Sequence, residues 1–179
     1  MFEIAGAADR EAGTDVTPTV LRAGTTVNTV PDLAEVSVDV RAWTLDELQR
    51  VDSFLRSLEP AHPDARLSLA GGINRPPMER QRTQRLFDLV SGVARELGLP
   101  PLQSAAVGGG SDGNFTTALG IDTLDGLGPL GDGAHARHEW VRIESIAERS
   151  RLAAALIERL RGAAEAPNSP CAAGQRGDR

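Results

Sequence analysis

Residues 33–60, LAEVSVDVRAWTLDELQRVDSFLRSLEP, contain two periodicities in succession. Over residues 33–42, valine takes every second position and polar residues lie between, which predicts a half-buried antiparallel strand. Over residues 45–58, apolar residues recur every three or four positions, which predicts a helix. Thr44, with Glu47 three residues later, predicts a capping box at the start of this helix.

The sequence on either side extends this strand–helix pair. β-branched residues at 15–23 and 24–30 predict two extended segments that meet at Gly24. Alternation returns at residues 66–70 and predicts one more strand. The resulting order, β-β-α-β, is about two-thirds of a ferredoxin-like α+β unit. We therefore predict a partial first domain over residues 1–72.

A second pattern begins after the Gly71-Gly72 pair. Residues 73–162 read as helix, strand, glycine-rich turn, helix, short strand, loop and helix, which predicts an α/β domain. Its long helices are expected at residues 83–97 and 145–160. The expected end signals are Gly98, a Ser145/Glu148 capping box and Gly162. Residues 163–179 are rich in Ala, Pro, Ser and Gly, and they predict a disordered tail.

Composition excludes several function classes. The net charge is -6, and the chain has no basic stripe for binding nucleic acid. All 19 basic residues are arginines, so no lysine can serve a P-loop, a Schiff base or a general base. The single cysteine, Cys171, has no disulfide partner within the chain. No stretch approaches the length of a membrane span, so a cytoplasmic protein without a membrane partner is expected.

Four short segments carry residues suited to binding chemistry: residues 24–31, 74–78, 108–114 and 133–141. Arg75 offers a planar fork for a carboxylate, Asn28 offers amide donors, and the amides of a glycine-rich turn bind oxyanions. Each segment also has a purely structural interpretation as a turn or a solvated loop. Together the residue types favour a ligand with a carboxylate.

Two other interpretations concern His135. His135 and His138 lie three residues apart and could share a metal, but zinc takes three or four protein ligands and no other cluster supplies them. If His135 is a ligand, its companions are elsewhere. Alternatively, Gly109–Gly113 matches G-x-S-x-G, and Ser111, acidic residues and His135 follow in the order of a serine hydrolase triad. The short spacing from Ser111 to His135 disfavours this alternative.

From about Asp15 to Leu160, the order of these segments resembles the zinc-dependent exopeptidases and amidohydrolases. This family includes glutamate carboxypeptidases of the carboxypeptidase G type, aminoacylase, acetylornithine deacetylase and succinyl-diaminopimelate desuccinylase. The resemblance implies a ferredoxin-like lid domain, which often dimerises, and an aminopeptidase-like α/β catalytic domain. It also implies metal-assisted hydrolysis of N-acyl or peptidyl amino acids with two zinc ions.

The resemblance assigns roles to individual residues. Asn28 matches the lid asparagine that holds the substrate, and Arg75 matches the arginine that binds its carboxylate. His135 matches the last zinc ligand, and Glu139 has the usual acidic position after it. No role carries over to His138. The glycine loop that lines the substrate pocket corresponds to Gly108, Gly109, Gly110, Ser111 and Asp112.

The other family motifs have no match in this chain. These are the H-x-D motif, the bridging aspartate, the Glu-Glu pair that includes the general base, and the lid histidine. We therefore expect the chain to be a C-terminal portion that is inactive alone. Its expected partners are a small carboxylate-bearing amide substrate and either a second copy, through the lid, or a separately encoded N-terminal half. The alternative is a non-catalytic module for dimerisation or carboxylate binding.

Overall fold

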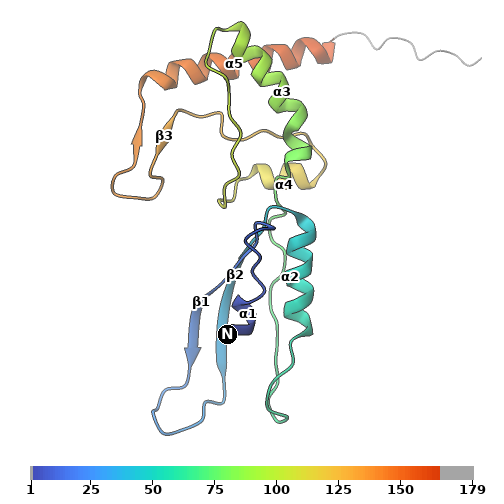
Figure 1. Ribbon diagram of the computed structural model, residues 1–179, viewed down its shortest axis with the longest axis vertical. Coiled ribbons are helices and arrows are strands. Elements are labelled where there is room, and N and C mark those ends of the chain that lie inside the picture. Colours follow the sequence, from blue (N-terminus) through green and yellow to red (C-terminus); the bar gives the residue numbers. More distant parts are fainter. Residues whose placement is uncertain (1, 166–179) are drawn as a thin grey trace, which may run out of the picture. The chain divides into compact units, whose positions relative to one another are not determined.

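The computed structural model describes residues 2–165, whose helices and strands are drawn in Figure 1. These residues fall into two compact units. The first unit comprises residues 2–86 together with Gln103–Asp125, and the second comprises Phe87–Leu102 and residues 126–165. The helices are α1 (Phe2–Ala5), α2 (Leu45–Ser57), α3 (Arg80–Glu96), α4 (Gly113–Ala118) and α5 (Glu144–Glu165). The strands are β1 (Asp15–Ala23), β2 (Ala34–Arg41), β3 (Gly131–Asp132) and β4 (Trp140–Val141).

The first unit is built on the antiparallel β1–β2 hairpin. Its register pairs Val16 with Val40, and the pairing shifts between Pro18 and Val20. Pro18 has no N–H to donate to a ladder, so an irregularity at this point is expected. The valines of β2 are half-buried while the polar residues between them are exposed, which confirms the alternation. Mixed helix and short antiparallel sheet is the observed class of this unit.

Helix α2 packs along β2 and starts where the sequence indicates. The hydroxyl of Thr44 accepts a hydrogen bond from the Glu47 amide at 3.3 Å, and Leu48 and Val51 are buried. The second contact of a capping box would run from the Glu47 side chain back to the Thr44 amide, but the Glu47 side chain has other partners here. The Glu47 carboxylate contacts Thr14 and Arg50, because a partner from outside the helix lies within its reach.

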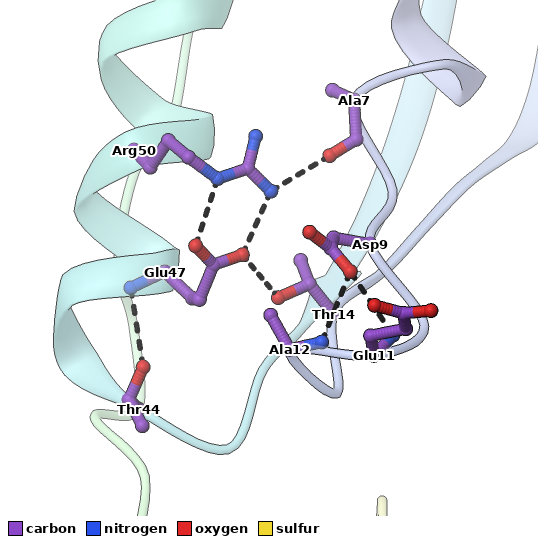
Figure 2. Close-up of polar contacts among 8 residues, drawn as sticks. All are labelled: Ala7, Asp9, Glu11, Ala12, Thr14, Thr44, Glu47 and Arg50. Atoms are coloured by element: carbon purple, nitrogen blue, oxygen red, sulfur yellow. Dashed lines mark hydrogen bonds and ion pairs between the residues drawn. The ribbon is translucent and has the colours of Figure 1, made fainter.

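Glu47 is the centre of a polar network that fastens the start of the chain to α2 (Figure 2). The hydroxyl of Thr14, which is buried, donates to Glu47 Oε2 at 2.6 Å. Arg50 donates to both oxygens of the same carboxylate, at 2.9 and 2.7 Å, and also to the carbonyl of Ala7 at 2.9 Å. Two donors on one carboxylate lower the pKa of Glu47 from 4.5 to about 2, with the Arg50 hydrogen bond as the larger cause.

This network predicts an acid-sensitive contribution to stability. Because the pKa of Glu47 is lower in the folded state, its contribution is fully present above pH 4.5 and is lost as the pH falls through about 2. We expect the melting temperature of Glu47→Gln to lie below that of the wild type at pH 6, and the gap to close between pH 4.5 and 2. Arg50→Gln removes the main donor to Glu47. Its melting temperature should also lie below that of the wild type at pH 6, and this difference should also close between pH 4.5 and 2. If the melting temperatures of all three proteins changed with pH in parallel across this range, Glu47 would not be the source of the acid sensitivity.

Two predicted extended segments, residues 24–30 and 66–70, are not strands in the described structure. Residues 24–30 form the turn between β1 and β2, and residues 66–70 have no strand partner. The alternating leucines of the latter segment, Leu67 and Leu69, are 55% and 43% exposed. A strand needs a neighbouring edge to pair with, and this segment meets none, so its pattern alone does not make it a strand. The ferredoxin-like arrangement is therefore not completed here.

The core of the second unit lies on α3 and α5. Val90, Val93 and Ala94 of α3 and Leu152 and Leu156 of α5 are buried. Helix α3 ends at Glu96, two residues before the predicted stop signal Gly98, whose φ is 69°. There the amides of Gly98 and Leu99 donate to the carbonyls of Arg95 and Ala94, which is a Schellman motif.

The start of α5 differs from its prediction. Helix α5 begins at Glu144, so Ser145 is inside it and is no N-cap. The Ser145 hydroxyl donates to the carbonyl of Arg142 and accepts from the amide of Leu130 at 2.9 Å. It thus ties the segment before β3 to the helix. Helix α5 continues past Gly162 to Glu165, and the rest of the predicted tail, with Cys171, lies outside the described residues.

No helix in the described part of the chain is both long enough and apolar enough to cross a bilayer. The predicted domain boundaries after residues 72 and 162 stay predictions.

Candidate functional site

Two of the four segments singled out in the sequence come together in the first unit. The side-chain amide of Asn114 donates to the carbonyl of Pro76 at 2.8 Å, and its oxygen accepts from the Ser111 amide at 2.8 Å. The sulfur of Met78 lies close to Gly113, since a Cβ at Gly113 would be 3.0 Å from it. One asparagine therefore links the segment that carries Arg75 to the glycine-rich turn.

Arg75 lies against this turn. A Cβ at Gly110 would be 3.1 Å from Arg75 Nη1, so the absence of a side chain at Gly110 allows the close approach. The guanidinium carbon lies 4.9 Å from the ring centroid of Phe115, and Nη2 lies 3.9 Å from the carboxylate of Asp112. The Arg75 side chain remains 42% exposed, so solvent and a small ligand can reach its N–H groups.

The turn itself is open and offers donors. Gly108, Gly109 and Gly110 are exposed, and the Asp112 side chain is 99% exposed. The Ser111 hydroxyl accepts from the Gly113 amide at 3.1 Å and can still donate its own hydrogen. An arginine fork, a hydroxyl and a glycine-rich backbone form an arrangement suited to a carboxylate.

The nucleophile-elbow alternative for Ser111 lacks its structural context. Residues 103–107, which would have to form the preceding strand, are neither strand nor helix. The Ser111 hydroxyl oxygen accepts a hydrogen bond from the Gly113 amide at the start of α4. Such a serine is exposed on a strained turn from a strand to a helix, and in the described residues the helix follows Ser111 but no strand precedes it.

Sequence reasoning missed a third contributor, Arg41. Its Nη1 donates to the carbonyl of Gly108 at 3.0 Å, and its Nε donates to Asp39 at 2.7 Å. Arg41 is the last residue of β2, so it ties one end of the hairpin to the glycine-rich turn. Its position on the polar face of an alternating strand predicted exposure but gave no signal of a partner 67 residues away.

Asn28 is not brought to Arg75. It is exposed in the turn that joins β1 and β2, beyond the Ala23–Ala34 pair, whereas Arg41 at the other end of the hairpin contacts Gly108. At about 3.3 Å per residue, the seven steps from Ala34 to Arg41 span roughly 23 Å. Asn28 therefore lies outside the cluster that these described contacts define.

His135 lies in the second unit, in the connection between β3 and β4. The pairs Gly131–Val141 and Asp132–Trp140 form this short hairpin, and His135 is exposed within it. The φ of His135 is 67°, the left-handed region that non-glycine residues rarely adopt. Such a conformation costs free energy and is more common at functional positions. The role of His135 as a zinc ligand stays a prediction.

A metal site is not complete in the described part of the chain. Among those residues no three His, Cys, Asp or Glu side chains are grouped so that they could hold a metal ion. The His138 ring packs near Gly133, where a Cβ would be 3.0 Å from its Cδ2. Two exposed histidines three residues apart do not by themselves fit the ligand set that zinc requires.

Comparison with models of protein families gives a match. Residues 4–159 match the sequence model described as Peptidase family M20/M25/M40. No curated protein matches the chain. The matched range includes both the Arg75 cluster and the hairpin that carries His135.

Proposed function

The chain belongs to peptidase family M20/M25/M40, a family of generally metal-dependent hydrolases in which zinc is common, and from this membership we propose its function. We propose that the chain is the C-terminal portion of a zinc-dependent, glutamate carboxypeptidase-like metallopeptidase or amidohydrolase. The substrates are N-acyl or peptidyl amino acids with a free carboxylate, and the scissile bond is an amide. The closeness of Arg75 to the turn Gly108–Asp112 is the observation that supports this proposal.

In this proposal the chain recognises the substrate. Arg75 pairs with the substrate carboxylate through two parallel N–H groups. The Ser111 hydroxyl and the exposed amides of the turn donate to the same group. Asn28 contributes when the hairpin turn meets a site, either through a second copy or through another chain. Because the described residues do not form a complete metal site, the remaining ligands and the general base come from outside them.

A binding experiment tests the recognition step. The chain is titrated with N-acetyl-L-alanine and with N-acetyl-L-alaninamide, which differ only in the carboxylate, and heat or amide chemical shifts are recorded. We expect the acid alone to bind, and Arg75→Ala to weaken binding by about tenfold or more, because a charge-assisted hydrogen-bond pair is lost. Arg22→Ala is a control, since Arg22 is exposed on β1 and pairs with Glu35, toward the end of the hairpin that lies away from Arg41. Equal binding of the acid and the amide, or no effect of Arg75→Ala, would overturn the carboxylate site.

The catalytic role has a separate test. We expect no hydrolysis of an N-acyl amino acid by the chain with zinc alone. We expect hydrolysis when a second chain with the H-x-D motif and the Glu-Glu pair is added. His135→Ala should then reduce the zinc bound by the combined chains, measured by competition with a zinc chelator. Unchanged zinc content in His135→Ala would remove His135 from the ligand set.

A non-catalytic module for carboxylate binding and dimerisation is the second candidate. Exposed apolar side chains on the first unit favour an association surface, including Val20, Leu21, Leu67 and Leu69. Such a module would bind N-acetyl-L-alanine and self-associate in sedimentation experiments. It would gain neither zinc nor hydrolytic activity from a complementing chain, and this separates the two candidates.

A further inference from the structure

The guanidinium of Arg75 lies over an aromatic ring on α4, the ring of Phe115. Phe115 is 43% exposed, so burial in a core does not account for its position. Its ring lies under the guanidinium, with the Arg75 Cζ 4.9 Å from the ring centroid. When the flat face of a guanidinium stacks on an aromatic ring, its N–H groups point outward in the guanidinium plane and stay available to a planar ligand.

The surroundings restrict the other movements of the same side chain. Nη1 and Cδ of Arg75 would lie 3.1 and 3.5 Å from a Cβ at Gly110, so the arginine runs close to the turn backbone. Asn114, directly before Phe115, fixes the neighbouring Pro76 carbonyl to the turn through two hydrogen bonds of 2.8 Å. The backbone that carries Arg75 and the backbone that carries Phe115 are therefore joined next to the stacked pair.

We propose that Phe115 is a positioning residue that holds the guanidinium of Arg75 ready for a ligand carboxylate. A free arginine side chain loses rotamer freedom when it binds a ligand, and a side chain already held in place loses less. The ring contributes to affinity through Arg75 and makes no contact with the ligand itself. This inference rests on the proposed carboxylate site and adds to it the residue that orients the arginine.

The test uses three variants and N-acetyl-L-alanine as the ligand. Phe115→Leu keeps an apolar side chain of similar size without the ring, and we expect it to weaken binding by about two- to fivefold, the range of an exposed cation–π contact. Phe115→Tyr keeps the ring and should retain wild-type affinity. In an Arg75→Ala background, which removes the cation that lies over the ring, Phe115→Leu should have no further effect. Melting temperatures confirm that each variant is folded.

A second measurement needs no ligand. The Arg75 side-chain protons lie over a ring, so they should show an upfield ring-current shift that Phe115→Leu removes and Phe115→Tyr retains. If the shift is present but the wild type does not bind N-acetyl-L-alanine, the proposed carboxylate site fails, and the positioning role fails with it. If the wild type binds and Phe115→Leu binds equally well, or loses the same factor in the Arg75→Ala background, only the positioning role is overturned.

Discussion

Leu152→Ala is expected to lower the free energy of unfolding of the second unit by about 2–5 kcal/mol, the range for a buried leucine that leaves a cavity. Leu152 is 0% exposed, and it is among the largest fully buried side chains of the described residues. The second unit has a small core, shared between α3 and α5, so few other contacts compensate. The loss is therefore expected to be a large part of the free energy that keeps this unit folded.

Ile157→Ala is the matched control on the same helix. Ile157 is 56% exposed, so removing its side chain leaves no cavity, and the expected loss is about 1 kcal/mol or less. Urea unfolding followed by circular dichroism, with amide hydrogen exchange along α5, measures both variants. Equal losses for Leu152→Ala and Ile157→Ala would mean that α5 does not bury Leu152 in solution.

Gly13→Ala is expected to destabilise the first unit by about 2–4 kcal/mol, the sum of a backbone term and a steric term. The φ of Gly13 is 72°, where an L-residue is strained. A Cβ at this position would be 2.1 Å from the Trp43 ring, so the ring has to move. Gly13 precedes Thr14, so the strain acts next to the Thr14–Glu47 hydrogen bond that joins the start of the chain to α2.

Gly120→Ala separates the two terms. The φ of Gly120 is 80°, but a Cβ there would have nothing within 4 Å, so only the backbone term, about 1 kcal/mol, is expected. Urea unfolding gives the stabilities. Fluorescence of Trp43 in a Trp140→Phe background reports the ring displacement. A Gly13→Ala protein as stable as Gly120→Ala, with unchanged fluorescence, would show that Trp43 does not pack on this turn.

Arg41 illustrates how much of the structure a local sequence pattern predicts. Alternation predicted β2 and placed Arg41 on its polar face, and both are observed. That Arg41 donates to the Gly108 carbonyl depends on how two segments 67 residues apart meet. Asn114 and Phe115 are similar, because their positions beside the glycine-rich turn were visible while their contacts with Pro76 and Arg75 were not.

The sequence by itself determined what depends on neighbours within one turn or one strand. It predicted β1 over residues 15–23, the alternation of β2, the Thr44 cap and the stop signal Gly98 after α3, because these follow from backbone preferences and local hydrogen bonds. The ordered set of binding motifs also predicted membership in the peptidase family, which the match over residues 4–159 confirms.

Only the tertiary structure decided which of those elements acquire partners. Residues 66–70 have the pattern of a strand but meet no edge, and Asn28 and Arg75 share a ligand type but lie in separate parts of the first unit. In contrast, Arg75 and the glycine-rich turn do meet, through Asn114. Pairing and clustering require that distant segments be brought together, and the free energy of those contacts depends on packing that no local window of sequence contains.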